Sequence, residues 1–518
     1  MNTRELFLSF VFPILFSCTL ECQTTYVDVD TSGRLRPEEI EYISRRDRRT
    51  HTSITQLLGK EVPDSVRLPR IAFIGSGGGF RATTDYIAML AALHRAGIFD
   101  CGTYAAGLSG GAWAIFPLVL RGLDPVSYSE ILKQRLCQRD TSGKKNILLK
   151  LAQIFFENYK KREAKKSKIN FVETWGAIVS ERLFGDIARE HCLTFNDIRA
   201  NLSQSDAFPY PVCPVLIGQT APNYEWIDIN PFGIYSSCLG GSIPNAAFGN
   251  VFESGHAAAL NKSQLSLEFY MGMVGSAFCL SIGDIIFNVI RDLLDMAQAD
   301  EILSITGADH FVNFTLGINR IIGKFGLYKE RFFPAKIPNY SYQMQGSKLK
   351  TLQTLELFDA GAFINLPFPT LIRKDRGIDI YIVCDSSSDA SDRDFTELRY
   401  AADWARAKGA KFPSLNKFKV VSPDMRIFYE DDTTVPYIIY FSNQIEVGTT
   451  ELFYTTEEFD KLFGFMHENV LNGSPAIVDV IRKKLNIPNT FDALPQGVPP
   501  SIEWESPLDF IKHHCSIL

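Results

Sequence analysis

Short apolar runs alternate with helical patterns along most of this chain. Ile71–Ile74 is an apolar run that stops at a glycine cluster, which is typical of a buried strand. A helical pattern follows through Leu93, and Thr103–Ala106 predicts another strand before an apolar helix. Ile378–Val383 is an apolar run apart from Asp379, and it predicts a buried strand; Tyr437–Phe441 predicts a further core strand. This alternation predicts an α/β fold built in layers.

Two glycine-rich turns each end a predicted strand and open a predicted helix. In the first, Gly77, Gly78 and Gly79 have no Cβ, so their backbone N–H groups can turn toward a bound anion. The second is Gly-Leu-Ser-Gly-Gly at residues 107–111, with Ser109 at the apex of a sharp bend typical of a nucleophile elbow. The two turns place a serine beside oxyanion donors, which indicates acyl transfer.

Each turn also has a purely structural interpretation. Gly-x-Ser-x-Gly can arise by chance in a chain with 36 glycines, and Ser109 could then lie in an ordinary strand–helix turn. The first turn could be a tight loop or a phosphate cradle, although no Gly-Lys-Ser/Thr follows its glycines. The two motifs alone therefore leave the chemistry open.

A third motif lies far downstream and reads Leu-Phe-Asp-Ala-Gly-Ala-Phe-Ile-Asn-Leu-Pro-Phe-Pro, with Asp359 at the end of an apolar run. Gly-Ser-Gly-Gly-Gly-Phe-Arg-Ala, Gly-Leu-Ser-Gly-Gly and Asp-Ala-Gly-x-x-x-Asn-Leu-Pro-x-Pro together resemble the catalytic domain of the cytosolic phospholipase A2 / lysophospholipase (phospholipase B) family. The order of the motifs also resembles that family, and the likeness covers nearly the whole chain. It implies a central mixed sheet flanked by helices, with a cap or lid region.

The resemblance implies a phospholipid acyl-ester hydrolase, a phospholipase A2 or lysophospholipase that releases fatty acid through an acyl-Ser109 intermediate. Asp359 would act as the base without a histidine, because burial can raise the pKa of a carboxylate toward the working range. The N–H groups of Gly78 and Gly79 would form the oxyanion hole, and that of Gly110 is a further candidate. From the residues alone, Asp359 would be interpreted as a turn residue that caps a strand end.

Arg81 and Arg376 resemble two family arginines that contact the substrate phosphate. Either could instead form a surface or structural salt bridge, and Arg376 lies in a looser stretch of the resemblance. No cofactor or metal is implied, and the chain has no Cys-x-x-Cys pair that would suggest zinc. No C2-like run of strands precedes the helical stretch at 36–58, so the expectation is a C2-lacking member that does not need calcium.

Two other functions remain open. A patatin-like acylhydrolase or a transacylase would use the same Ser–Asp dyad, although patatins usually carry Asp-Gly-Gly/Ala and a shorter chain. An inactive lipid-binding protein on the same scaffold is the other alternative, and an activity assay separates it. The expected partners are phospholipids, lysophospholipids and a membrane surface. The formal net charge of −6 argues against nucleic acid and against membrane capture by bulk positive charge.

The expected division of the chain is a leader at 1–22, a catalytic domain at 35–500 and a tail at 501–518. The leader contains an apolar run of signal-peptide length, and the tail ends in Cys-Ser-Ile-Leu, a candidate prenylation box at Cys515. A secreted chain would not meet a cytosolic prenyltransferase, so at most one of the two is used. A membrane-associated protein, secreted or lipid-anchored through the leader, is favoured over a cytosolic one prenylated at Cys515.

Two internal segments are candidates for lipid contact. Residues 144–168 carry nine Lys or Arg against two Glu, with apolar residues at helical spacing, which is typical of a basic amphipathic helix. The alternative is a solvated helix packed on the domain. Residues 278–328 combine apolar helical patterns with glycines, as a lid would, although a plain helical subdomain fits equally well.

Overall fold

The structure is a computed structural model that describes residues 26–137, 171–187, 192–257, 264–277, 334–388, 390, 395–449 and 451–497. The proposed leader, the tail, the basic segment at 144–168 and the lid segment at 278–328 lie outside these residues. The expectations attached to them therefore stay predictions.

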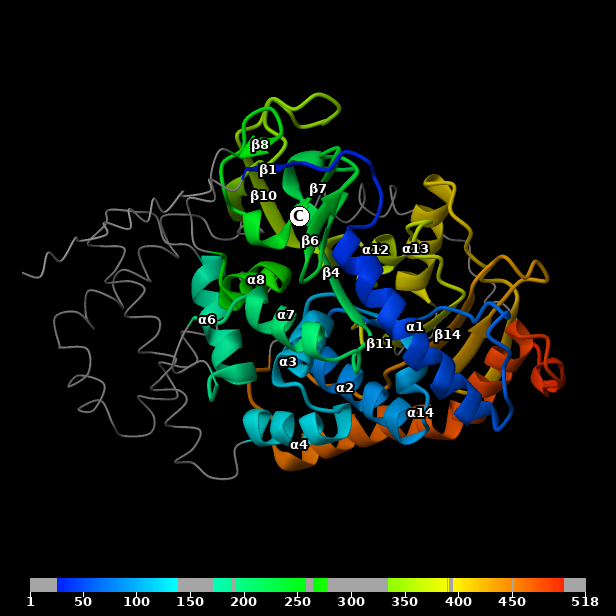
Figure 1. The fold of residues 1–518 in the computed structure, drawn as a ribbon. Helices are drawn as coiled ribbons and strands as arrows, with labels where there is room; N and C mark the ends of the chain where they lie inside the picture. The colour runs from blue at the N-terminus through cyan, green and yellow to red at the C-terminus, as the bar shows by residue number, and fades with distance from the viewer. Residues whose placement is uncertain are drawn as a thin grey trace, which may run out of the picture.

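A large mixed sheet organises the described residues (Figure 1). Its strands are β2 (Ile71–Gly75), β3 (Gly102–Gly107), β4 (Tyr210–Ile217), β5 (Glu225–Ile229), β6 (Gly233–Ser236), β7 (Gly241–Pro244), β9 (Ala335–Pro338), β10 (Thr354–Asp359), β11 (Ile380–Asp385), β12 (Phe418–Ser422), β13 (Met425–Phe428) and β14 (Tyr437–Ser442). They follow the order β12–β13–β14–β11–β2–β3–β4–β5–β6–β7, and β10 pairs with both β4 and β9. β14, β11, β2, β3 and β4 are parallel neighbours, and the other pairings are antiparallel. A separate pair joins β1 (Val27–Asp28) to β8 (His256–Ala257).

The apolar runs of the sequence form the strands predicted from them. They correspond to β2, β3, β11 and β14, although β11 begins at Ile380, two residues later than its apolar run. Every residue of these four strands is buried, as expected for parallel strands covered on both faces. The predicted α/β fold with a central mixed sheet flanked by helices is therefore confirmed.

Helices surround the parallel part of the sheet. They are α1 (Pro37–Leu58), α2 (Gly79–Arg95), α3 (Gly110–Arg121), α4 (Pro125–Leu136), α6 (Phe171–Phe184), α7 (Phe195–Gln204), α8 (Leu267–Val274), α12 (Phe368–Leu371), α13 (Thr396–Ala407) and α14 (Thr456–Lys484). α2 and α3 contact the parallel strands and each other, α14 packs along α2, and α1 lies against β3 and β4. Among the helices that the structure describes, none combines the length and the apolar character needed to cross a bilayer.

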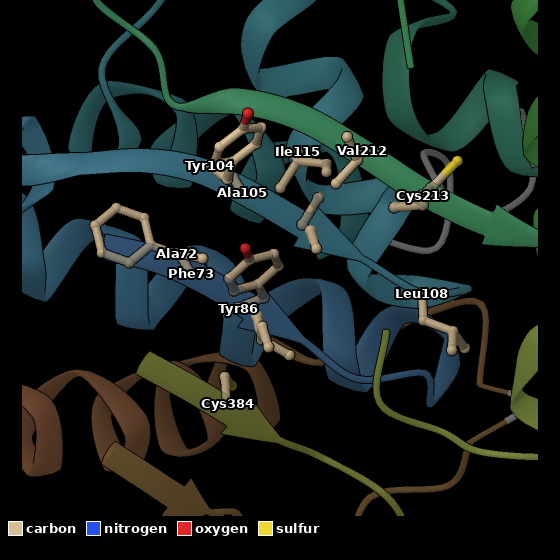
Figure 2. Close-up of a cluster of buried hydrophobic side chains, with 14 of the residues drawn as sticks. Ala72, Phe73, Tyr86, Tyr104, Ala105, Leu108, Ile115, Val212, Cys213 and Cys384 are labelled. Carbon is tan, nitrogen blue, oxygen red and sulfur yellow. The ribbon is translucent and has the colours of Figure 1, made fainter. Parts of the chain in front are cut away.

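The core lies between the sheet and α2 and α3. α2 is buried from Gly79 to Leu93 because the sheet, α3, α4 and α14 all pack against it, which fits its apolar sequence. Figure 2 shows Tyr86 of α2 and Ile115 of α3 in one buried cluster with Val212 of β4. This close-packed core carries the carboxyl ends of β2 and β3, where the two glycine turns lie.

Candidate active site

Ser109 lies at the apex of the turn from β3 into α3. Its backbone angles are φ 50° and ψ −116°, a conformation that non-glycine residues adopt rarely and mostly at functional sites. The turn can be this tight because its neighbours lack a Cβ: one on Gly107 would overlap the backbone of Gly111. A Cβ on Gly111 would in turn press on the carbonyl oxygen of Gly75 in β2. The predicted sharp turn at Ser109 is thus present.

The first glycine turn presents backbone donors next to Ser109. Gly78 and Gly79 have φ angles of 137° and 61°, which favour glycine. The N–H of Gly77 is already bonded to the carbonyl oxygen of Asn365 at 3.2 Å. For the N–H groups of Gly78, Gly79 and Gly110, the described residues provide no acceptor. Three N–H groups are therefore available to an anion here, two of them the expected oxyanion donors.

Strand pairing brings Asp359 to the same place. Asp359 ends β10, where it lies opposite Val215 of β4. β4 also runs parallel to β3, with Val212 opposite Ala106, three residues before Ser109. The Asp359 carboxyl accepts a 2.9 Å hydrogen bond from the N–H of Gly361, as a strand-end cap would. It also lies close enough to Ser109 that the serine hydroxyl lowers its pKa.

The electrostatics of this pair suit proton transfer. Burial raises the pKa of Asp359 to about 6, against the opposing effects of the Gly361 N–H, the Ser109 hydroxyl and the Ala277 backbone. The Ser109 hydroxyl is buried, and none of the described residues gives it a partner at full hydrogen-bond geometry. A carboxyl with a near-neutral pKa beside a buried hydroxyl can act as a general base toward it.

The described histidines lie elsewhere. Each contacts a group outside this site: His51 with Asp64, His94 with Phe99, His256 with Asp28 and His467 with Phe463. Asp359, in contrast, lies beside Ser109.

Arg81 lines the first glycine turn from the first turns of α2. Its Nε and Nη2 donate to the carbonyl oxygen of Ser386 at 3.1 and 2.8 Å, and its Nη1 donates to that of Val447 at 2.8 Å. These bonds use three of the five N–H groups that a guanidinium carries. Nη2 lies 3.2 Å from the point that a Cβ on Gly78 would occupy. Arg81 is therefore a positive charge held beside the expected oxyanion donors.

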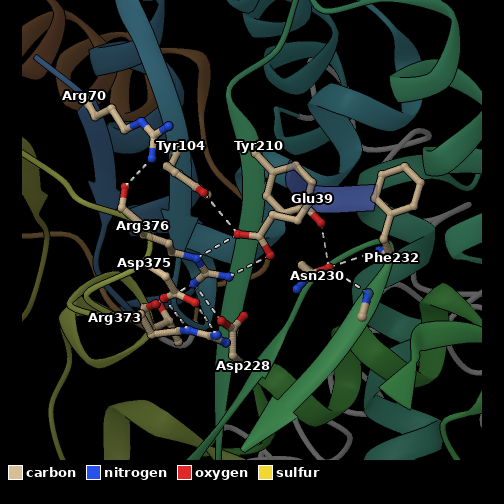
Figure 3. Close-up of polar contacts among 12 residues, drawn as sticks. Glu39, Arg70, Tyr104, Tyr210, Asp228, Asn230, Phe232, Arg373, Asp375 and Arg376 are labelled. Carbon is tan, nitrogen blue, oxygen red and sulfur yellow. Dashed lines mark hydrogen bonds and ion pairs between the residues drawn. The ribbon is translucent and has the colours of Figure 1, made fainter. Parts of the chain in front are cut away.

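The expectation for Arg376 is corrected by its position. Its side chain has 0% exposure, and it is paired with Glu39 of α1 at 2.9 Å and with Asp228 of β5 at 2.6 Å (Figure 3). Its carbonyl oxygen accepts a hydrogen bond from Arg70, which precedes β2. It therefore lies at the amino ends of the strands whose carboxyl ends carry Ser109. A guanidinium enclosed between two carboxylates there cannot contact a substrate phosphate.

Asp85 is a second buried carboxyl near this site, and no sequence motif predicts a role for it. Asp85 lies on α2, one turn beyond Arg81, and its Oδ2 accepts a 2.6 Å hydrogen bond from the Ser386 hydroxyl. The signal in the sequence is a single carboxylate within a largely apolar helical pattern. Such a carboxylate is almost never buried without a partner, so its position indicates a polar group packed against it. Its partner Ser386 had no motif to identify it.

A cavity of about 410 Å³ lies elsewhere, along α13 and the loop that follows it. Its lining includes Arg399, Phe412 and Glu430 but none of the residues around Ser109. In the described residues, no group of three or more His, Cys, Asp or Glu side chains could hold a metal ion.

Comparison with known proteins identifies similar catalytic domains. Residues 71–437 match the family model described as the lysophospholipase catalytic domain. Human cytosolic phospholipase A2 zeta is 24% identical over 485 residues, which cover 83% of this chain and 55% of that protein. The chain thus spans about half the length of this curated relative.

Solved structures show the same fold. Human GIVD cytosolic phospholipase A2 superposes with a TM-score of 0.68 at 19% identity, covering 89% of this chain and 68% of that one. The same human protein in complex with methyl gamma-linolenyl fluorophosphonate gives a TM-score of 0.64 at 18% identity, covering 89% of this chain and 66% of that one.

Proposed function

The chain belongs to the lysophospholipase catalytic domain family, and from this premise we propose that it hydrolyses acyl esters of phospholipids and lysophospholipids through a Ser109–Asp359 dyad. The observation that supports this most strongly is the pair itself. A buried serine hydroxyl without a full hydrogen bond lies beside a buried carboxyl whose pKa is raised to about 6.

The reaction follows from the positions of these groups. Asp359 takes the proton of the Ser109 hydroxyl as Oγ attacks the ester carbonyl carbon. The resulting oxyanion accepts hydrogen bonds from the N–H groups of Gly78 and Gly79, with Gly110 as a third donor. The carbon–oxygen bond to the alcohol then breaks, and Asp359 returns the proton to the departing alkoxide. Water activated by Asp359 cleaves the acyl-Ser109 ester, which releases the fatty acid and restores the serine.

Arg81 provides the charge that favours a phospholipid over a neutral ester. Its guanidinium keeps unused N–H groups beside the oxyanion donors, and such groups pair well with phosphate oxygens. The base and the anion donors all come from the chain, so we propose that the chemical step needs no calcium. Excess chelator should leave the rate on dispersed substrate unchanged, and a calcium-restored collapse of activity would refute this.

The test combines product analysis with labelling of the serine. Wild-type protein incubated with defined phospholipids and lysophospholipids should release free fatty acid, measured by mass spectrometry. A lipid fluorophosphonate should add to the Ser109 oxygen with loss of fluoride, which raises the mass of that peptide. Ser109→Ala should abolish both results. Transfer of the acyl group to a second lipid would instead indicate a transacylase, and no reaction at all would indicate an inactive lipid-binding protein.

Ser254 offers a matched control. It is another serine with a positive φ, 52°, but it is exposed and lies in a loop beside β8. Ser254→Ala should keep the wild-type rate and the wild-type label. Fatty-acid release that survives Ser109→Ala, or a label found on another residue, would rule out the dyad.

We also propose that the protein meets its substrate at a membrane surface, since that is where phospholipids are presented. A single lipid chain binds membranes only marginally, so stable association needs two contacts. One would be a terminal anchor, either the leader at 1–22 or a prenylated Cys515. The other would be the basic segment at 144–168.

A further inference from the structure

Asp85 is a fully buried carboxyl on α2 that the proposed reaction does not use. One of its oxygens, Oδ2, accepts from the Ser386 hydroxyl at 2.6 Å. The other, Oδ1, is buried and has no hydrogen-bond partner among the described residues. A half-satisfied buried carboxyl destabilises a folded chain, so its presence beside the active site calls for a functional reason.

Ser386 connects this carboxyl to the groups around Ser109. Its hydroxyl donates to Asp85, while its carbonyl oxygen accepts two of the three hydrogen bonds that Arg81 donates. Its N–H donates to the Ser76 hydroxyl at 2.7 Å, and that hydroxyl donates to the carbonyl oxygen of Gly77 at 2.9 Å. A displacement of Ser386 would therefore move both the arginine and the glycine turn.

The Gly78 backbone also packs directly on Ser386. The carbonyl oxygen of Ser386 lies 2.7 Å from the point that a Cβ on Gly78 would occupy, closer than real Cβ atoms approach an oxygen. The glycine turn, Arg81 and Asp85 thus all contact Ser386, the residue that directly follows β11.

The charges of Asp85 and Arg81 act on each other, and Arg81 also acts on Asp385, a buried carboxyl that ends β11. Burial raises the pKa of Asp85 to about 7, while the Ser386 hydroxyl and the Arg81 charge oppose that rise. The other titratable groups that feel its charge are the Cys384 thiol of β11 and the Tyr454 hydroxyl, just before α14. Burial raises the pKa of both groups above their ordinary values, so both are neutral near pH 7. A change of charge at Asp85 is therefore felt by Arg81.

We propose that Asp85 is a positioning residue for the hydrolysis, which acts through Ser386 to hold Arg81 in the orientation that binds the substrate phosphate. The ionised carboxylate attracts Arg81 and fixes the Ser386 hydroxyl. When the carboxyl is protonated, this attraction is lost and Arg81 holds the phosphate less well. This inference rests on the proposed function, because it assigns Asp85 to the same site.

Two substrates with one acyl chain separate this role from a structural one. A lysophospholipid carries the phosphate that Arg81 would bind, and a monoacylglycerol does not. Asp85→Asn should raise KM for the lysophospholipid about fivefold to tenfold, the loss expected when one hydrogen bond of ordinary strength is removed. The rate on the monoacylglycerol should stay within about twofold of wild type. KM of the wild type for the lysophospholipid should rise as the pH falls through about 7, and that of Asp85→Asn should not.

Variants of Ser386 test the connection between Asp85 and Arg81. They also provide a second test if Asp85→Asn does not fold. Ser386→Ala removes the hydroxyl and should reproduce the effect on KM, while Ser386→Thr keeps a hydroxyl and should restore most of the affinity. Asp228→Asn is a matched control, since Asp228 is also a buried carboxyl but is paired with Arg376 and not with Ser386 or Arg81. It should leave the ratio of the two substrates unchanged. Rates are expressed per active site titrated with a lipid fluorophosphonate.

The outcomes distinguish this inference from the proposed function. Wild-type protein that cleaves neither ester would overturn the proposed function, and the inference with it. If the wild type is active but Asp85→Asn and Ser386→Ala lower the rates on the two substrates equally, or lower neither rate, the inference is overturned and the proposed function stands. A selective loss on the lysophospholipid, rescued by Ser386→Thr, supports it.

Discussion

The carbonyl oxygen of Gly79 occupies the space that a Cβ on Gly110 would need. The turn after β2 and the turn after β3 therefore touch backbone to backbone, and no other residue type fits at position 110 without moving one of them. This contact sets the distance between the Ser109 oxygen and the N–H groups that would receive the oxyanion.

Gly110→Ala should strongly reduce ester hydrolysis, because the methyl group pushes the two turns apart. A displacement of about 1 Å at a reacting centre can lower the rate by on the order of a hundredfold. The measurement is kcat/KM on a neutral ester together with the melting temperature. Gly464→Ala in α14 is the control, since nothing lies within 4 Å of its Cβ position. That variant should keep full activity and gain up to about 1 kcal/mol of helix stability. Equal activity of the two variants would contradict the packing argument.

The activity should follow the ionisation of Asp359. The base works only when deprotonated, so kcat/KM on a neutral ester should be level above about pH 7 and should fall as the pH drops through about 6. Asp359→Asn should lose roughly a thousandfold or more in kcat and show no such limb. A pH–rate profile of both proteins checks this. An acidic limb in the wild type centred near the ordinary carboxyl pKa of about 4 would show that Asp359 is not the base.

Stability should depend on pH through Asp85. The pKa of Asp85 in the folded protein, about 7, exceeds the ordinary aspartate value of 3.8, so the folded protein binds this proton more tightly than the unfolded chain. This tighter proton binding contributes on the order of 4 kcal/mol to the free energy of unfolding. The contribution is complete below about pH 4 and is lost as the pH rises through about 7. Asp85→Asn removes this dependence. The melting temperature of the variant minus that of the wild type should therefore increase from pH 5 to pH 8. A difference between the two proteins that does not change with pH would contradict this.

Arg376 should matter for stability and not for catalysis. Arg376→Met leaves Glu39 and Asp228 buried without their cation, which should destabilise the fold by about 3–5 kcal/mol. Denaturant unfolding measures the loss, and kcat/KM per titrated active site should match the wild type. Adding Glu39→Gln and Asp228→Asn to the same chain should recover much of the stability, since the uncompensated charges are then gone. A selective rise in KM for phospholipid in Arg376→Met would restore its original assignment as a phosphate contact.

Membrane association should separate into an anchor and a basic segment. Neutralising Lys160, Lys161, Lys165 and Lys166 should weaken binding to anionic vesicles, and the wild-type advantage should fade as salt screens the charges. Vesicle sedimentation measures both effects. Deletion of residues 1–22 and Cys515→Ser then distinguish the anchors, because only the variant that lacks the anchor in use should leave the membrane fraction. Vesicle binding that survives the lysine changes would mean that the segment is ordinary surface.

The sequence by itself determined the parts of this protein that depend on local geometry. Apolar runs specify β2, β3, β11 and β14, because a strand buried on both faces needs apolar side chains at most of its positions. The glycine turns and the bend at Ser109 could be predicted for a similar reason. Where a Cβ would collide with neighbouring backbone, glycine is the residue that fits, so the motif records the shape of the turn.

Only the tertiary structure decided which polar groups face one another. Asp359 reaches Ser109 because β10 pairs with β4, a register that no local pattern encodes. The role of Arg376 depends on Glu39, which lies 337 positions away, and Asp85 meets Ser386 across 301 positions. The sequence does not show whether a charged side chain is solvated or buried. Its function is set by the partners and the loss of water that folding imposes, and these come from contacts distant along the chain.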